Sequence, residues 1–193
     1  MTVKDPTAPG TLDRVRRFVN TVSFTTAPPT DKLATAHSAE QWLRENGLLE
    51  GSGALDEAGA ERLRAFREAV RLALLAHAGD ADPAVAWERV HDLAENVRLV
   101  MRFGGQPGEA SLAPGGHGAE ETMGRLVAAI YDAFRTGIWP RLKACRMGDC
   151  LWAFYDHSKN GSGAWCSMAG CGNRAKAQRR RARAGTKFEP AEL

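Results

Sequence analysis

Apolar residues recur at spacings of three and four along most of residues 12–136, which is typical of amphipathic helices. The first predicted helix covers residues 12–22, and the Pro28-Pro29 pair after it cannot continue a helix. Its apolar face is expected to carry Leu12, Val15, Val19 and Val22. The pattern therefore predicts a short helix that buries one side against the rest of the protein.

A second, shorter helix is predicted around Trp42 and Leu43, which form its apolar face. Ser38 is placed to cap its first turn, and Gln41 three residues later would complete a capping box. Gly47 is expected to end it, because glycine readily adopts the left-handed conformation that is common after a helix C-terminus.

Two longer helices are predicted between residues 56 and 97. Asp56 is expected to cap the first and Gly79 to end it. Asp82-Pro83 starts the second, because Asp accepts hydrogen bonds from free amides and Pro fits the first helical turn. The buried faces are expected to carry Leu63, Phe66, Val70 and Leu74 in the first helix, and Trp87, Val90, Leu93 and Val97 in the second.

Near residue 98 the period changes from helical to alternating. Residues 98–103 are predicted as a strand paired with residues 109–113 across a glycine-rich turn. A further helix is predicted over 119–136, with Gly137 and Pro140 as stops. Its inward residues are expected to be Met123, Leu126, Val127, Ile130 and Phe134. The whole pattern predicts a mainly α protein whose helical N-terminal domain includes one short β-hairpin and is large enough for its own core.

Composition and charge place this chain among soluble globular proteins, with 44% hydrophobic and 25% charged residues. No run approaches the ~20 apolar residues of a membrane span, and the first thirty residues contain no apolar signal core. A cytoplasmic location is therefore expected, with no membrane partner.

The net charge is +3, but residues 141–193 sum to +7 and residues 1–140 to −4. A basic C-terminal region favours a polyanionic partner, although a solvated basic surface without a partner is the alternative.

The four cysteines of the protein form two matched pairs. Cys145 and Cys150 are followed, after fifteen residues, by Cys166 and Cys171, and each pair encloses four residues. Two such pairs supply the thiolates of a tetrahedral zinc site, and four cysteines make the site structural rather than catalytic. A redox-active dithiol is the alternative. His157 lies between the pairs, but with four thiolates available it is expected to be a turn or surface residue.

The residues around these cysteines predict a small zinc-binding domain. Residues 151–156 are expected to form an aromatic strand, and Asn160-Gly161 is a strong signal for a hairpin turn that returns the chain to Cys166. Cys171 would then begin a helix over 172–184, where free amides and the helix dipole favour a thiolate. A knuckle, a β-hairpin and a basic helix in this order are treble-clef-like.

The predicted C-terminal helix carries a stripe of basic residues. Lys176, Arg180 and Arg183 fall along one side, and Arg179 and Arg181 flank them. Such a stripe can neutralise several phosphates, and one arginine could read guanine in the major groove.

Trp152, Phe154 and Trp165 are expected to form the small core of the zinc-binding domain, with stacking on single-stranded bases as the alternative. Asn173 is expected to brace the knuckle through backbone hydrogen bonds. For Arg174 two roles stay open, bracing the knuckle in the same way or contacting DNA.

Residues 141–181 closely resemble the CGNR zinc finger, named for the tetrapeptide that occurs here as Cys171-Gly172-Asn173-Arg174. Residues 154–160 are similar to the aromatic-Asp-x-Ser-basic-Asn segment of that family. In that family the finger usually follows a helix-rich ABATE domain linked to stress-related transcription regulation, and residues 18–21 and 41–49 resemble its opening pattern. One departure is Gly163-Ala164, where the family commonly places arginines; if that hairpin normally touches phosphate, this protein lacks the contact.

The sequence and the resemblance together predict a transcription regulator with three parts: an ABATE-like sensor or dimerisation domain at 1–138, a CGNR-type finger at 141–184 and a frayed tail at 185–193. The expected partners are double-stranded DNA, a small-molecule ligand and a second copy of the chain, and the cofactor is one Zn²⁺. Residues expected to contact DNA, mostly through phosphate, are Arg174, Lys176, Arg179, Arg180, Arg181 and Arg183.

Two other binding functions compete with this prediction, namely an RNA-binding or ribosome-associated protein and a protein–protein adaptor. An enzyme is not expected, because the four histidines of the N-terminal region are scattered and no phosphate-binding loop follows a clear strand.

Overall fold

The structure, a computed structural model, describes residues 7–106 and 109–185, with side chains as far as residue 182. The region predicted as a tail therefore lies outside the described residues from 186 onward. Within them the chain forms six α-helices. These are α1 (Leu12–Val19), α2 (Ala36–Glu45), α3 (Glu57–Ala76), α4 (Pro83–Ala94), α5 (Ala119–Arg135) and α6 (Asn173–Gly185). None of the described helices is long and apolar enough to cross a membrane.

Three short antiparallel hairpins accompany the helices. They are β1 (Val22–Ser23) with β2 (Thr30–Asp31), β3 (Leu99–Phe103) with β4 (Ala110–Pro114), and β5 (Leu142–Ala144) with β6 (Ala153–Tyr155). The β3–β4 hairpin confirms the strand pair predicted from the alternating pattern, with Met101 opposite Leu112. The mainly α fold with a small cysteine-rich module is thus confirmed.

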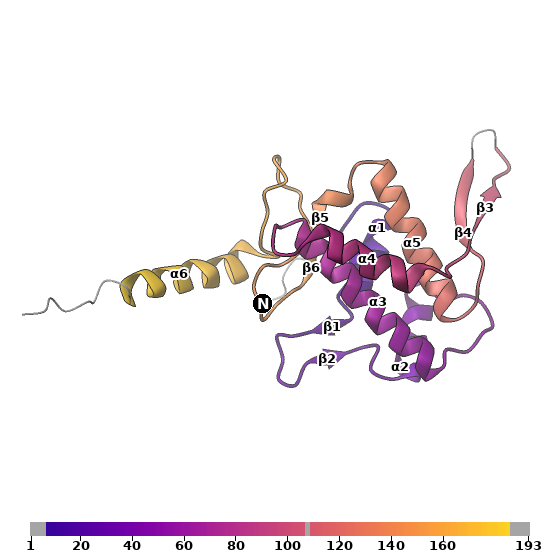
Figure 1. Cartoon of the computed structure of the whole chain (residues 1–193), viewed down its shortest axis with the longest axis horizontal. Coiled ribbons are helices and arrows are strands. Elements are labelled where there is room, and N and C mark those ends of the chain that lie inside the picture. The colour runs from indigo at the N-terminus through magenta and orange to yellow at the C-terminus, as the bar shows by residue number, and fades with distance from the viewer. Residues whose placement is uncertain (1–6, 107–108, 186–193) are drawn as a thin grey trace, which may run out of the picture.

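Helices α1, α3 and α5 pack against one another at the centre of the body, and α4 covers the outside of α3 (Figure 1). Phe18 of α1 and Phe66 of α3 are fully buried, with ring centroids 6.4 Å apart. Met123 of α5 completes this region of the core and is also fully buried. The helical periodicity of the sequence therefore identified the faces that meet here.

The predicted helix starts are confirmed at two places and wrong at one. Asp56 accepts a hydrogen bond from the Gly59 amide, and Asp82 accepts one from the Ala84 amide. In α2, however, Thr35 rather than Ser38 is the N-cap. The Thr35 hydroxyl accepts from the Ser38 amide while the Ser38 hydroxyl accepts from the Thr35 amide, so Ser38 occupies the third helical position.

Two further predictions are corrected by tertiary contacts. Helix α1 ends at Val19, and Val22 instead pairs with Asp31 in the β1–β2 hairpin. Phe134 was expected to face inward but is 51% exposed. It lies on Trp139, which follows α5 and is itself buried, with ring centroids 5.4 Å apart.

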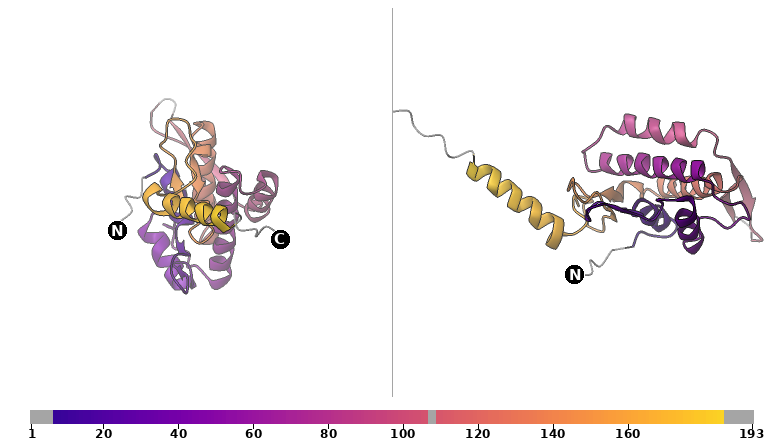
Figure 2. Two further views of the ribbon diagram at one scale, coloured as in Figure 1. Left: turned by 90° about the vertical axis from the view of Figure 1, so that its left-hand side faces the viewer. Right: turned by 90° about the horizontal axis from the view of Figure 1, so that it is seen from below.

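The molecule is elongated because two elements project from opposite ends of the helical body. Helix α6 extends away from the body at one end, and the β3–β4 hairpin stands at the other (Figures 1 and 2). Strand β5 packs on α3 and strand β6 packs on α1, so the base of the cysteine-rich module is built onto the body.

Candidate metal centre and nucleic-acid interface

The first cysteine pair lies in the turn of the β5–β6 hairpin. Cys145 directly follows β5, and its amide donates to the Trp152 carbonyl at 2.9 Å. The Cys150 and Leu151 amides both donate to the Met147 carbonyl, which closes a tight knuckle. The predicted pairing of the aromatic strand across Asn160-Gly161 is wrong, because β6 pairs with β5 on the other side of the first cysteine pair.

Residues 157–165 form a loop that a buried ion pair holds in place. Lys143 and Asp156 are both about 95% buried, with Nζ and Oδ2 2.9 Å apart. Lys143 also donates to the Gly161 and Gly163 carbonyls, and Asp156 accepts from the Ser158 and Gly163 amides. Burial alone would raise the pKa of Asp156, but hydrogen bonds from Ser158, Lys143 and Gly163 hold this pKa well below its usual range.

The same loop explains why glycine occupies position 163. A Cβ at this position would lie 2.8 Å from the carboxyl carbon of Asp156. A larger residue would therefore displace the carboxylate that organises the loop.

The second cysteine pair lies on a turn that leads directly into α6. Ser167 caps this turn, since its hydroxyl accepts from the Gly170 amide at 3.2 Å, and residues Met168–Gly172 form one wide helical turn. Cys171 is in that turn, two residues before α6 begins. The Asn173 amide group donates to the Ala169 carbonyl at 3.2 Å, so the predicted bracing role of Asn173 is confirmed.

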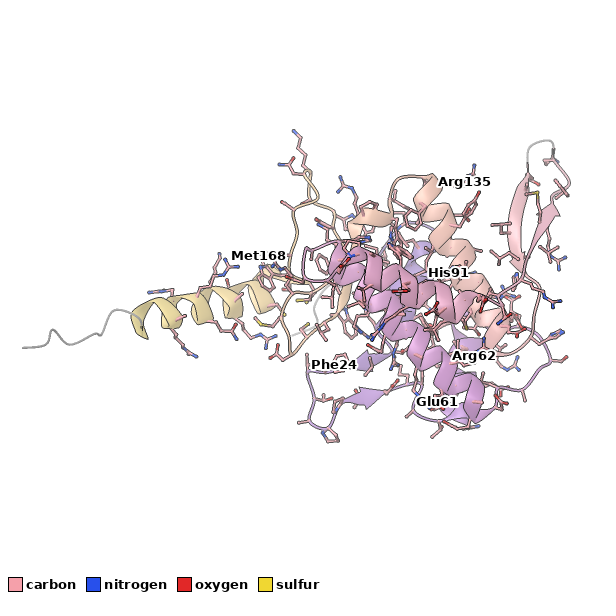
Figure 3. The ribbon with its side chains drawn as sticks, in the orientation of Figure 1. Phe24, Glu61, Arg62, His91, Arg135 and Met168 are labelled. Carbon is pink, nitrogen blue, oxygen red and sulfur yellow. The ribbon has the colours of Figure 1, made fainter. Side chains whose placement is uncertain are left out.

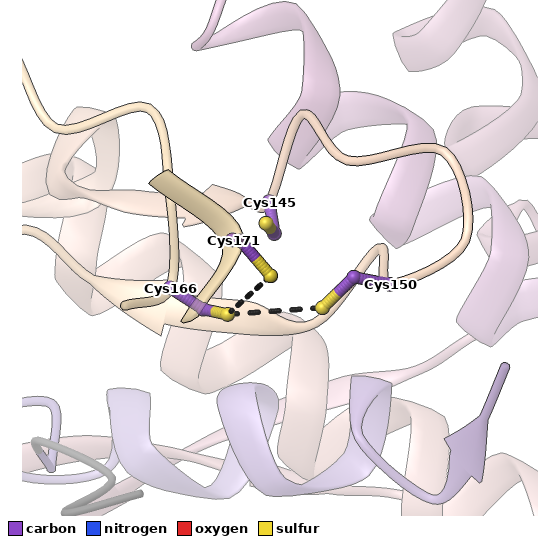
Figure 4. Close-up of side chains that lie close together, drawn as sticks. All are labelled: Cys145, Cys150, Cys166 and Cys171. Atoms are coloured by element: carbon purple, nitrogen blue, oxygen red, sulfur yellow. Dashed lines mark hydrogen bonds between the residues drawn. The ribbon is translucent and has the colours of Figure 1, made fainter. Parts of the chain in front are cut away.

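The four sulfur atoms converge on one point (Figure 4). All lie within 4.8 Å of one another, and the Sγ atoms of Cys150 and Cys171 are each 3.7 Å from that of Cys166. A tetrahedron with Zn–S bonds of about 2.3 Å has edges of about 3.8 Å. Cys145, Cys150, Cys166 and Cys171 therefore have the spacing of the ligands of one structural Zn²⁺.

The closeness of the four thiols has an electrostatic consequence. Hydrogen bonds from Cys150 and Cys166 lower the pKa of the Cys145 thiol, whereas the bond with Cys145 raises the pKa of Cys150. Thiolates this close together repel one another unless a cation lies between them. A divalent cation supplies that charge.

Arg174 lies against the metal centre. Its guanidinium donates to Cys171 Sγ at 3.3 Å and to Asp149 Oδ2 at 2.6 Å. These contacts raise the pKa of Arg174 above its ordinary value, with the Cys171 bond as the first cause. The arrangement places one positive charge beside the thiolate cluster and gives Arg174 a structural role.

Beyond Arg174, helix α6 has almost no contact with the rest of the protein. Ala175 is 6% exposed and packs against Phe154 and the cysteines, whereas every residue from 176 to 182 is exposed. Side chains of α6 extend both above and below the helix in Figure 3. Lys176, Arg179, Arg180 and Arg181 make no ion pair or hydrogen bond with another described side chain. Arg183 lies on the same helix, but its side chain is outside the described residues.

Two family models match the chain in this order. The ABATE model, described as "Putative stress-induced transcription regulator", covers residues 12–137, and the CGNR zinc finger model covers residues 141–184. The chain belongs to the ABATE family. No curated protein matches the chain. The resemblances seen in the sequence are thus confirmed for both parts of the chain.

The core of the CGNR finger is built from the aromatic residues that the sequence suggested. Phe154 is 4% exposed and packs with Met147 and the cysteines, while Trp152 and Trp165 are partly buried against them. His157 is exposed, and its Nε2 donates to the Thr7 carbonyl at 3.2 Å, away from the cysteine cluster. The prediction that His157 is not a ligand fits the four-cysteine cluster.

The finger is attached to the ABATE domain by buried polar contacts. Asn20, at the end of α1, accepts from the Ala153 amide at 2.7 Å and donates to the Ala153 carbonyl at 2.9 Å. Arg71 of α3 donates to the carbonyls of Val19 and Leu151 at 2.6 and 2.7 Å. Leu151 follows Cys150 directly and has a positive φ of 52°. Arg71 therefore ties the body to the knuckle that holds the first cysteine pair.

The sequence analysis did not identify these supporting residues. Lys143 and Asp156 could have been suspected, since a Lys within Leu142-Lys143-Ala144 interrupts an apolar strand and must find a buried partner. Arg71 and Asn20 left no such signal, because the backbone groups of the finger that they bind, Leu151 and Ala153, lie 80 and 133 residues away in the chain.

Proposed function

We propose that this ABATE-family chain is a DNA-binding transcription regulator in which the CGNR finger presents helix α6 to double-stranded DNA. The zinc-bound cysteines fix the root of the helix, and Lys176, Arg179, Arg180, Arg181 and Arg183 contact the duplex, mostly through phosphate. Arg174 was expected among these contacts, and its bonds with Asp149 and Cys171 favour the structural role instead.

The observation that carries this proposal is the exposure of a basic helix on all sides. Isolated helices of about 13 residues are marginal in water and gain their stability from packing on an apolar face. Helix α6 has no such face beyond Ala175 and carries no acidic residue. Its exposed positive charges are therefore available to an external polyanion, and a DNA groove accepts a helix of this width.

A single short helix covers little DNA, so useful sequence specificity requires two copies on two half-sites. We propose that the ABATE domain mediates this pairing and senses a small ligand. The regulator would act in the cytoplasm, at the nucleoid, and would bind rather than transform its ligands.

The test is selection of random double-stranded oligonucleotides on the zinc-loaded protein at about 150 mM salt, the physiological range. An enriched motif with two-fold symmetry supports a dimeric regulator that reads sequence. DNA retained without any motif, and lost steeply as salt rises, would reduce α6 to a nonspecific phosphate-binding element. No retention of DNA at low salt would refute the proposal.

RNA binding through stacked bases is less consistent with the geometry. Phe154 is buried in the finger core, and Trp152 and Trp165 pack on that core with part of their surface. Competition between a duplex and a single strand of equal length measures the preference directly.

A further inference from the structure

A cavity lies at the end of the ABATE domain far from α6. It measures about 800 Å³ and lies between the β3–β4 hairpin, α5, α1 and the segment that follows α2. This volume is within the range of small-molecule sites. The cavity is separate from the zinc centre, and none of its lining residues belongs to the CGNR finger.

Packing at the base of the hairpin explains how the cavity forms. Gly124 lets α5 approach the hairpin closely, since a Cβ there would lie 2.8 Å from Pro114 Cβ. From this contact the hairpin and α5 diverge (Figure 1). Farther along, the lining of the cavity includes the small residues Ser111 and Ala113 of β4 and Ala128 of α5, which leave space between the two elements.

The charged residues of the cavity fall into two groups. In the first, Arg125 pairs with Glu50 and Glu121 at 2.8 and 3.0 Å, and Glu121 also accepts from the Glu50 and Gly51 amides. Burial, the largest single influence, would raise the pKa of Glu121. The hydrogen bonds from Arg125 and from the Glu50 and Gly51 amides together outweigh it, so this pKa lies below its usual value. This group is satisfied within the protein.

The second group has no side-chain partner within the described residues. Arg14 on α1 and Arg102 on β3 line the cavity from different walls, and neither side chain pairs with another side chain in the described residues. Asp132 on α5 also lines the cavity without such a pair. Arg14, Arg102 and Asp132 sum to +1, whereas Arg125, Glu50 and Glu121 sum to −1, so the positive charge without a side-chain partner lies at Arg14 and Arg102. A single carboxylate suits these two arginines better than a phosphate monoester, which carries nearly two negative charges.

We propose that this cavity binds a small monocarboxylate with an apolar body. The carboxylate lies between Arg14 and Arg102, whose planar guanidinium groups suit a two-oxygen anion. Val100, Leu112, Pro114 and Ala128 contact the apolar part. The inference deepens the sensing role proposed above and rests on it for its biological meaning.

Helix α1 offers a direct connection from this site to the finger. Arg14 lines the cavity near the start of α1, and Asn20 immediately after α1 holds the Ala153 backbone of β6 by two hydrogen bonds. A shift of α1 on ligand binding would therefore reach the hairpin that carries Cys145 and Cys150.

The test is a thermal-shift screen of the zinc-loaded full chain against aromatic and medium-chain aliphatic monocarboxylates, each with its primary amide. We expect at least one carboxylate to raise Tm by roughly 5–10 °C at about one hundred times its Kd, and its amide to have no effect. The double variant Arg14→Gln/Arg102→Gln should weaken binding about 10- to 100-fold. Arg89→Gln, an exposed arginine on α4 away from the cavity, is the matched control.

Ala113→Phe provides a second test that does not depend on charge, because its side chain should occupy the cavity and abolish the shift. Stabilisation by no carboxylate, equal stabilisation by the amides, or a shift that survives both sets of substitutions would overturn the proposal. DNA affinity measured with and without the carboxylate separates the two proposals. Binding of the ligand without DNA binding would refute the proposed function and leave the site intact.

Discussion

Helices α3 and α6 use arginine in opposite ways. Arg67 and Arg71 of α3 are 4% and 3% exposed, and Glu68 lies between them and pairs with both. Arg67 also forms a two-pronged ion pair with Asp31, at 2.6 and 2.8 Å. The arginines of α6 beyond residue 174 are exposed as far as the described side chains extend, on a helix without an acidic residue.

The difference shows that the partners of a guanidinium group decide its role. Arg67 and Arg71 of α3 bind carboxylates and backbone carbonyls inside the protein, so they position the β1–β2 hairpin and the zinc knuckle. Those of α6 have no internal partner, so they remain available to an external anion. Arg174 belongs to the first class despite its place on α6, because Asp149 and Cys171 hold it.

The largest effect should come from the metal centre. Replacing Cys166 with Ser removes one zinc ligand, and structural zinc contributes about 10–16 kcal/mol to the folding of small fingers. We expect zinc content to fall from one ion per chain to none, the finger to unfold and DNA binding to disappear, while the helical body stays folded. Metal analysis and circular dichroism measure the first two effects. Ser162→Ala, in the exposed loop of the same finger, is the control and should behave like the parent. A Cys166→Ser variant that binds no zinc but keeps the DNA affinity of the parent would contradict this prediction.

The next effect concerns the buried arginines of α3. Arg71→Met would leave the Val19 and Leu151 carbonyls without their donor and Glu68 with one partner fewer, a loss of about 3–5 kcal/mol in the free energy of unfolding. Zinc should stay bound, because no ligand changes. Urea unfolding checks the value against Arg89→Met, which should lie within about 0.5 kcal/mol of the parent. Similar values for the two variants would erase the contrast between buried and exposed arginines.

On α6 the expected effect is on DNA binding and not on stability. Replacing Arg179, Arg180 and Arg181 with Gln removes three positive charges, and Gln has nearly the helix propensity of Arg. The slope of log affinity against log salt should become shallower by about 3, while the unfolding free energy changes by less than about 0.5 kcal/mol. Fluorescence anisotropy with a labelled duplex over a salt series measures the slope. An unchanged slope would mean that these arginines do not contact phosphate.

The smallest effect is a pH dependence from Asp31. Burial alone would raise the pKa of Asp31, but the bonds from Arg67 and the Leu33 amide hold it below its usual value. Its contribution to stability is therefore present above the unfolded-state pKa of about 3.9 and is lost as pH falls through the lower folded-state value. We expect the unfolding free energy to fall more in this acid range in the parent than in Asp31→Asn. Parallel acid profiles for the two proteins would remove Asp31 from the network.

Part of the candidate site could be predicted from the sequence because it depends on local spacing. Two cysteine pairs with equal spacing, followed by a basic stretch, indicated one zinc ion and one exposed helix before any contact was known. The strand pairing in the finger was predicted wrongly. Asn160-Gly161 indicated a turn after the aromatic strand, but the turn signal does not say that residues Leu142–Ala144 would be the strand that pairs with it. Strand pairing depends on which segments meet, and a turn signal alone does not contain that information.

The sequence by itself determined the helical body, the caps at Asp56 and Asp82, the ligand set of the zinc centre and the basic character of α6. Each of these follows from residue type and short-range periodicity. Only the tertiary structure decided that Arg71 and Asn20 fasten the finger to the body, that Arg174 serves the metal centre, and that Arg14 and Arg102 line one cavity. These contacts join residues far apart in the chain, so they exist only once the packing of the helices has fixed which faces meet.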